Sequence, residues 1–356
     1  MTKQTTEPNA ISLSKAFFNE VVRPAMERTC PAVLDAAACG RFGWGSECFG
    51  MDDAISRDHH WGPRIDLLLP DKLFHETPET VWRDVSQHFP DTFRGFKLEP
   101  GHVGGAGLAP ESIDAFLMRT IGRVTVPVSA EDWLGIPEED IPHVINGEVW
   151  HDGAGQFSRM RAVLGAYYPD EVWRRRLANW CRYASGMGLY ALHRALLREN
   201  WAFAHTTMAR ALKLTMELTF MLNRTYFPYD KWLYPTFRGL PELAPEMLPL
   251  IDEVAENGTP WPRRVVLFGA LHDILDAKMV RLGLVRPHPR FKPSETSGYR
   301  LLEWCYYDLL KGLPAEIRPI VPLTEQIFME QWVVDYVAGL TDDEWLHLLC
   351  LEPEDE

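Results

Sequence analysis

A glycine-serine turn followed by a polar cluster carries the residues best suited to chemistry. Gly45-Ser46 has the composition of a tight turn whose backbone N–H groups can face a phosphate, because Gly tolerates unusual backbone angles and Ser can cap a following helix. Segment 56–60, SRDHH, follows soon after. On an extended chain Asp58 and His60 point to the same face, since side chains alternate along a strand. They therefore form a candidate metal-binding or proton-transfer pair.

Asp66 is a second acidic candidate for the same metal. It has the strand parity of Asp58, but a straight strand would separate the two by roughly 26 Å, at about 3.3 Å per residue. They meet only if Gly62-Pro63 turns the chain, which a Pro inside an extended run favours.

The ligand types restrict the metal. Mg²⁺ prefers oxygen ligands in octahedral geometry, whereas imidazole suits Zn²⁺, Mn²⁺-like or iron ions. Near neutral pH, His60 can also act as a general base. The alternative for Asp58-His59-His60 is a polar turn with no role in binding, and the sequence leaves both interpretations open.

Four segments resemble one bacterial family. Segment 45–64, GSECFGMDDAISRDHHWGPR, resembles the opening signature of the DUF4037 family, and segments 149–153, 168–173 and 222–232 are similar to later parts of it. The resemblance extends from about residue 11 to about residue 280. It implies the nucleotidyltransferase fold of the polymerase-beta type, in which the turn holds nucleotide phosphates and carboxylates hold Mg²⁺.

The chain departs from that family at two expected metal ligands. His60 stands where the family pattern has a second Asp, and a Glu expected on a later strand falls near Ala109. Glu99, Glu111 and Asp114 are other acids in this region, but none lies in the expected register. These departures argue against efficient two-metal catalysis.

Composition restricts the class of protein. A length of 356 residues with 46% hydrophobic residues predicts two domains with ample core. The formal net charge of −14 argues against general nucleic-acid binding. The six cysteines form no Cys-x-x-Cys pair, and no signal peptide or run of 18 apolar residues occurs. We expect a cytoplasmic protein that does not enter membranes.

The predicted elements place the turn in an N-terminal α/β domain. A helix is expected at 11–29, a short strand at 32–38 leading into the turn, a strand at 64–69, and helices at 79–88 and 112–122. A glycine-rich loop is expected at 93–109. Prolines and the acidic segment 138–140 indicate a linker. The domains are therefore predicted at 11–142, nucleotidyltransferase-like, and 143–350, helical, which gives an α+β fold class.

The second domain is expected to be a bundle rather than a repeat array. Helical periodicity occurs at 168–181, 186–198, 201–224, 263–284, 299–311 and 323–340. Lys231 at a helix end can contact a phosphate, and Tyr229 can stack on a base, with interdomain packing as the alternative. His205, Arg210, Lys213 and Glu217 form a row typical of a solvated or interfacial face.

Three functions remain. The first is transfer of a nucleotidyl group from an NTP to an unknown small-molecule or protein acceptor. The second is a redirected or inactive fold acting on, or sensing, a small molecule, and the third is a regulatory, antitoxin-like binding protein. The candidate cofactor is a divalent metal, Mg²⁺ or Mn²⁺ with Zn²⁺ as the alternative. The candidate residues are Asp58 and His60 for catalysis; Asp58, His60 and Asp66 for metal; and Gly45, Ser46, Arg64, Tyr229 and Lys231 for the nucleotide.

Overall fold

The chain forms two compact units that are not consecutive halves of the sequence. The computed structural model describes residues 9–53, 55–57, 61–98, 107–287, 301–341 and 344. The first unit comprises residues 1–126, 140–166 and 326–356, and the second comprises 127–139 and 167–325. The structure thus divides the chain at other points than the single boundary expected at residue 142.

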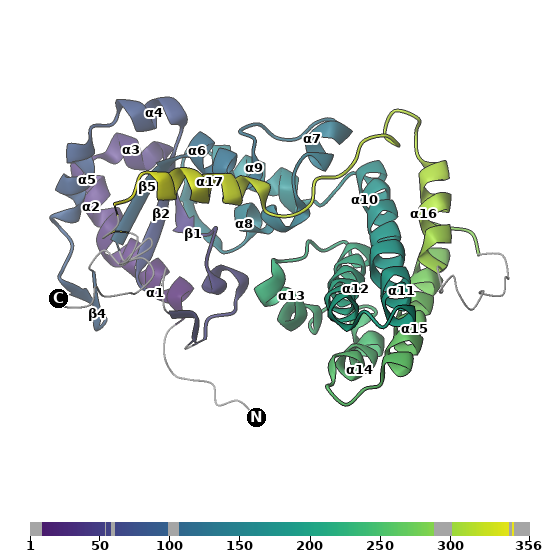
Figure 1. Cartoon of the computed structure of the whole chain (residues 1–356). Coiled ribbons are helices and arrows are strands. Elements are labelled where there is room, and N and C mark those ends of the chain that lie inside the picture. Colours follow the sequence, from purple (N-terminus) through teal and green to yellow (C-terminus); the bar gives the residue numbers. More distant parts are fainter. Residues whose placement is uncertain are drawn as a thin grey trace. The chain divides into compact units, whose positions relative to one another are not determined.

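A four-stranded mixed sheet forms the centre of the first unit (Figure 1). Its strands are β1 (Ala38–Arg41), β2 (Arg64–Leu69), β5 (Gly107–Ser112) and β6 (Glu148–Asp152), in the order β5-β2-β1-β6. β1 pairs antiparallel with β2 and β6, whereas β2 pairs parallel with β5. Strand β6, which sequence periodicity did not predict, completes the sheet from beyond the expected domain boundary.

The register of the sheet places Asp66 at its centre. Asp66 on β2 lies opposite Gly40 on β1 and beside Ala109 on β5. Ala109 is the position near which the family resemblance leads us to expect a carboxylate. A small apolar side chain therefore stands next to Asp66 where a third acid was expected.

The first helices of the chain pack on the sheet and contribute to its core. α1 (Ala10–Phe17), a π-helical segment (Phe18–Val22) and α2 (Arg23–Thr29) follow one another, which confirms the helix expected at 11–29. Phe17 and Phe18 are buried together with Ile65, Leu67 and Leu69 of β2. This apolar layer fixes the face of β2 opposite to the one that carries Asp66, since alternate residues of a strand point to opposite sides.

The strand expected at 32–38 is wrong. Residues 31–36 form the short helix α3 (Pro31–Ala36), and the strand begins only at Ala38. Pro31 occupies the first turn of this helix, where its missing N–H costs nothing and its fixed φ favours helix initiation. The apolar run alone did not distinguish a buried strand from a short buried helix.

The remaining elements of the first unit are short. They are the 3₁₀ helices η2 (Ser46–Phe49) and η3 (Ile55–Arg57), the strands β3 (Thr92–Phe93) and β4 (Phe96–Lys97), and the helices α4 (Asp71–Glu76), α5 (Glu79–Ser86), α6 (Ile113–Ile121), α8 (Pro142–Ile145), α9 (Gln156–Gly165) and α17 (Ile327–Ala338). Helices α5 and α6 confirm the predictions at 79–88 and 112–122, with ends that differ by one or two residues.

The described part of the second unit is helical. It contains α7 (Ala130–Leu134), α10 (Asp170–Arg182), the π-helical segment η5 (Tyr183–Tyr190), α11 (Ala191–Leu197), α12 (Trp201–Leu222), α13 (Asp230–Phe237), α14 (Ala244–Ala255), α15 (Trp261–Arg281) and α16 (Leu301–Gly312). A mixed sheet in one unit and helices in the other confirm the α+β class. None of the helices that the structure describes is both long and apolar enough to span a membrane.

Candidate functional site

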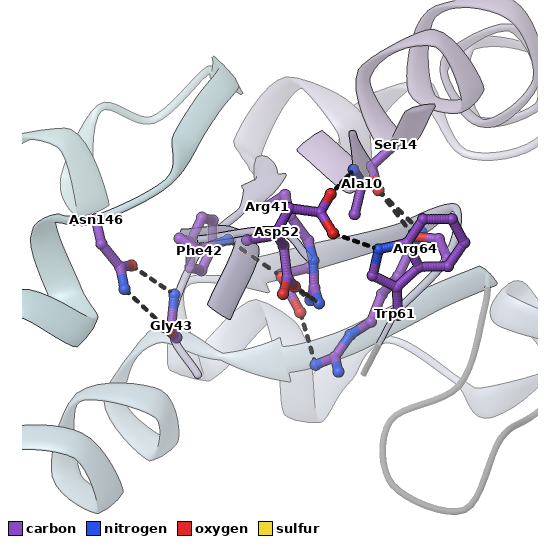
Figure 2. A network of polar contacts seen from close by, with 12 residues as sticks. Ala10, Ser14, Arg41, Phe42, Gly43, Asp52, Trp61, Arg64 and Asn146 are labelled. Atoms are coloured by element: carbon purple, nitrogen blue, oxygen red, sulfur yellow. Dashed lines mark hydrogen bonds and ion pairs between the residues drawn. The ribbon is translucent and has the colours of Figure 1, made fainter. Parts of the chain in front are cut away.

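Three buried charged side chains, Arg41, Glu47 and Asp66, form a network with the half-buried Arg64 beside the glycine-serine turn (Figure 2). Arg41 Nη1 lies 3.2 Å from Asp66 Oδ2, and Arg64 Nη2 lies 2.8 Å from Asp66 Oδ1. Arg41 Nη2 pairs in addition with Glu47. The backbone N–H of Phe42 donates a third hydrogen bond to Asp66, at 3.3 Å. Both oxygens of the Asp66 carboxylate are therefore already engaged by cations.

The charges within this network compensate one another. Burial alone would raise the pKa of Asp66, but Arg64, Arg41 and the Phe42 N–H outweigh it, so the pKa lies below its ordinary value. Burial would lower the pKa of Arg41, yet Asp66, Cys48 and Glu47 raise it above its ordinary value. Asp66 and Arg41 are thus both ionised at neutral pH. Removal of one member of such a buried ion pair leaves a buried charge without its partner, which is strongly destabilising.

The turn at Gly45-Ser46 folds around its own neighbour. A Cβ atom at Gly45 would lie 2.5 Å from Glu47 Oε1, so only glycine allows Glu47 to approach. Ser46 opens the 3₁₀ helix η2 and is buried, and no side chain caps this helix. The turn therefore helps to enclose the Arg41–Glu47 pair, and its phosphate-binding role stays a prediction.

Asn146 and His143, from a later segment of the first unit, contact the residues just before the turn. The Gly43 N–H donates to Asn146 Oδ1 at 2.9 Å, and Asn146 Nδ2 donates to the Gly43 carbonyl at 2.8 Å. His143 stacks on Trp44 with ring centroids 3.4 Å apart. Burial lowers the pKa of His143 to about 3, which keeps its ring neutral. Figure 2 shows Asn146 facing Gly43 in this arrangement.

The metal site expected from the sequence is only partly visible. Asp58 and His60 lie outside the described residues. Asp66, the third expected ligand, is held by two arginines, and Glu111 on β5 pairs with Arg119, with Glu111 Oε1 2.9 Å from Arg119 Nε. In the part of the chain that the structure describes, no group of three or more His, Cys, Asp or Glu side chains could hold a metal ion.

The expected nucleotide-binding residues divide between the units. Gly45, Ser46 and Arg64 belong to the first unit, and Tyr229 and Lys231 to the second. Tyr229 is the N-cap residue of α13 and is half-buried. Lys231 is exposed, with Nζ 5.1 Å from the centre of the Trp232 ring.

The second unit contains a cavity of about 680 Å³ that the sequence did not reveal. We call it the acidic cavity. Its lining combines acidic, aromatic and aliphatic side chains, and includes Glu138, Glu139, Trp180, Tyr183, Lys213, Glu217, Phe227 and Asp230. Segment 138–140, expected to be a linker, is buried, and Glu217, expected on a solvated or interfacial face, is 3% exposed.

Burial and hydrogen bonding set the charges of the acidic cavity. Trp180 Nε1 donates to Glu217 Oε2 at 2.7 Å. Lys213 Nζ lies 2.6 Å from Asp230 Oδ1 and 3.7 Å from Glu217 Oε1. Desolvation raises the pKa of Glu217 to about 8, although Lys213 and Trp180 act in the opposite direction. Desolvation likewise raises the pKa of Glu138 to about 8 against the effect of Arg176.

One feature of the sequence is consistent with the acidic cavity. Glu217 lies within a run of otherwise apolar or Thr residues at 214–222, which is typical of a buried helix face. An acid in such a run indicates a buried carboxylate. Because Lys213 lies four residues before Glu217, the sequence equally fits an ordinary i,i+4 pair on a solvated face.

Comparison with known proteins identifies a domain in the middle of the chain. No curated protein matches it. One solved structure, a nucleotidyltransferase-like protein from Exiguobacterium sibiricum 255-15, is 11% identical, with 76% of each chain covered and a TM-score of 0.36. A family model described as "Domain of unknown function (DUF4037)" matches residues 133–233, which include Glu138, Glu217 and Lys231. Residues 133–233 therefore match the DUF4037 family, which the sequence motifs also resemble.

Proposed function

We propose that this protein has a nucleotidyltransferase-like first unit whose metal-dependent transfer chemistry has been lost or redirected, and that the protein acts by binding a small molecule. The observation that carries this proposal is the state of the Asp66 carboxylate. Arg41 and Arg64 engage its two oxygens, and Phe42 N–H adds a hydrogen bond. A carboxylate held in this way is a poor ligand for a divalent ion, because metal binding would weaken its ion pairs with the buried Arg41 and the half-buried Arg64.

The neighbouring strand supports the same proposal. In the nucleotidyltransferase-like pattern that the sequence resembles, a carboxylate is expected near Ala109, and this residue lies directly beside Asp66 in the sheet. Ala offers no ligand atom. His60, which replaces the other expected acid, would have to act with Asp58 alone.

Nucleotidyl transfer from an NTP to a small-molecule or protein acceptor is the second candidate. The observation in its favour is the order of elements. Strand β1 leads into the Gly45-Ser46 turn and η2, and β2 then places Asp66 beside Gly40 of β1. In this alternative Asp58 and His60 hold Mg²⁺ or Mn²⁺, or Zn²⁺, while Arg64, Tyr229 and Lys231 contact the nucleotide.

Metal affinity separates the two candidates without knowledge of the acceptor. Calorimetric titration with Mn²⁺, in the presence of ATP, GTP, CTP or UTP, should give no saturable metal site in the wild-type chain. The double variant His60→Asp/Ala109→Glu restores both acids of the family pattern, and we expect it to gain at least tenfold in Mn²⁺ affinity. Ala154→Glu, which adds an acid at an exposed position of the same unit, is the control and should gain nothing.

Pyrophosphate release gives the opposing result. If the wild-type chain binds Mn²⁺ saturably and releases pyrophosphate from any of the four NTPs, and Asp58→Ala abolishes both, the chain is an active nucleotidyltransferase and our proposal is wrong. Absence of saturable metal binding in the wild type together with its gain in the double variant supports a redirected fold.

A further inference from the structure

We propose that the acidic cavity binds a small organic cation with at least one amine group, whose ammonium faces the carboxylates of Glu138, Glu139 and Glu217 while its carbon skeleton packs on the aromatic wall. This inference specifies the ligand class for the function proposed above. It depends on that proposal for one point only, that the protein binds a small molecule.

The size and walls of the acidic cavity suit a small molecule. Its volume of about 680 Å³ falls within the range of roughly 300–1,000 Å³ of ligand pockets. Residues of α10, η5, α12 and α13 line it, together with 138–139 and 324–325. All of these belong to the second unit, so the helical bundle forms the cavity by itself.

The charge of the lining selects a cation. Five carboxylates and two cationic side chains line the acidic cavity, namely Glu138, Glu139, Glu217, Asp230 and Glu325 against Arg210 and Lys213. Lys213 pairs most closely with Asp230, which is largely exposed, and Arg210 is exposed. The acids of the lining therefore outnumber its cations, so a cationic ligand that favours their ionised forms gains attraction that an anionic ligand does not.

Glu138 provides an independent indication of a missing partner. Its side chain is 1% exposed, and neither carboxylate oxygen has a hydrogen-bond partner within normal geometric limits. Arg176 and the hydroxyl of Tyr168 are near enough to lower its pKa, but less than burial raises it. Burial of a carboxyl group without hydrogen bonds costs about 1–3 kcal/mol. An ammonium in the acidic cavity adds a cationic partner to the contributions of Arg176 and Tyr168, which do not offset the burial of this acid.

The aromatic wall provides the second half of cation recognition. The Trp180 ring centre lies 6.2 Å from that of Tyr183 and 5.8 Å from that of Phe227. Because the Trp180 N–H is bonded to Glu217, the ring is fixed next to the buried carboxylate. Ring faces attract cations most strongly where water is excluded, which places the ammonium between the aromatic wall and the acids.

Proton release should accompany binding. Desolvation raises the pKa of both Glu138 and Glu217 to about 8, so each is mostly protonated in the empty cavity at pH 7. Glu217 is faced by Lys213 and Trp180, and by the charges of Glu139 and Asp230; Glu138 is faced by Arg176, Tyr168 and Glu217. An ammonium favours the ionised form of both acids. The affinity for an amine that stays protonated over this range should therefore rise from pH 6.5 to 8.5.

Isothermal titration of the full chain with spermidine tests the proposal, with choline as the comparison because its ammonium has no N–H to donate. We expect saturable spermidine binding, at least tenfold tighter than choline binding, and net proton release measured in two buffers of different ionisation enthalpy. Glu217→Gln and Glu138→Gln should each weaken spermidine binding at least tenfold. Glu246→Gln, which removes the same charge from an exposed site on α14, should leave it unchanged.

Circular dichroism of each variant separates loss of the site from loss of the fold, and Glu139→Gln serves as the alternative variant if either buried substitution unfolds the chain. Absence of saturable spermidine binding overturns the inference, as does equal weakening by Glu246→Gln, which would indicate diffuse attraction to a chain of net charge −14. Equal affinity for choline overturns the amine requirement. None of these results would restore metal-dependent nucleotidyl transfer, so the two proposals fail separately.

Discussion

Arg41 on β1 and Asp66 on β2 are paired across adjacent strands, with Arg41 Nη1 3.2 Å from Asp66 Oδ2 and the arginine side chain fully buried. Glu47 and Arg64 extend this pair at its two ends. The four charges tie the turn after β1 to the centre of the sheet. Asp66 therefore contributes to the fold of the first unit.

Loss of Asp66 should destabilise the first unit strongly. Asp66→Asn keeps the size of the side chain but removes the charge that compensates Arg41 and Arg64, and breaking a buried pair in this way costs about 3–5 kcal/mol. Urea denaturation at pH 7 measures the change. Asp84→Asn, at an exposed position of α5, is the control and should change stability by less than about 0.5 kcal/mol. An equal, small effect of both variants would show that the network contributes little.

Substitution of Gly45 should disturb the same network from the turn. The added Cβ of Gly45→Ala would lie 2.5 Å from Glu47 Oε1 and would displace Glu47 from Arg41. We expect a loss of about 1–3 kcal/mol in the free energy of unfolding, from overpacking of a buried site. Gly165→Ala is the matched control, because its Cβ meets no atom within 4 Å. Full stability of Gly45→Ala would mean that the turn tolerates rearrangement.

The two hydrogen bonds between Asn146 and Gly43 predict an asymmetric response to substitution. In Asn146→Asp the carboxylate can still accept from the Gly43 N–H, but it can no longer donate to the Gly43 carbonyl and repels it. We expect a loss of about 1–3 kcal/mol at pH 7, partly recovered at pH 4, where the new carboxyl group is partly protonated. Thermal unfolding at the two pH values, relative to the wild type, measures the difference. A loss independent of pH would exclude a donor role for Asn146.

The acidic cavity gives stability a definite pH dependence. The pKa of Glu217 is about 8 in the folded chain against an ordinary value of 4.5, so between these values the folded state holds a proton that the unfolded state has lost. The free energy of unfolding therefore decreases as the pH rises from about 4.5 to 8, by up to about 1.4 kcal/mol per pH unit for one such group. Glu138 contributes with the same sign.

Glu217→Gln should remove one part of this dependence. Relative to the wild type, the variant should gain about 1–3 kcal/mol in stability between pH 5.5 and pH 8.5, as measured by urea denaturation. Glu246→Gln should follow the wild-type curve. If the Glu217→Gln curve also runs parallel to that of the wild type, Glu217 is ionised in the folded chain and the charge pattern inferred for the acidic cavity is wrong.

The sequence predicted those elements whose own residues determine their structure. Strand β2 was predicted with its observed bounds, Arg64–Leu69, because an apolar run bounded by Gly-Pro and Pro leaves few alternatives. The long helices α12 and α15 followed from periodicity alone. By contrast, β6 is a strand because β1 is available to pair with it, and no local pattern at 148–152 records that partner.

The candidate functional residues likewise depend on tertiary contacts that the sequence does not show. The motifs select Asp66 as a metal ligand and Arg64 as a nucleotide contact, and both roles stay predictions. The sequence does not show that Arg41 lies within reach of Asp66. From the sequence, Glu138 is expected in an exposed linker, because an acidic run beside prolines is usually solvated. Only the tertiary structure shows that the chain buries this acid next to Glu217 and Trp180 in a common cavity.

Strand β6 has a practical consequence for anyone who produces the first unit separately. A fragment that stops at residue 142 would lack β6 and expose the backbone N–H and C=O groups along one side of β1. Open strand edges recruit strands from other molecules, so such a fragment should precipitate during expression. A usable fragment has to continue at least through Ala166, where the chain leaves this unit for the second time.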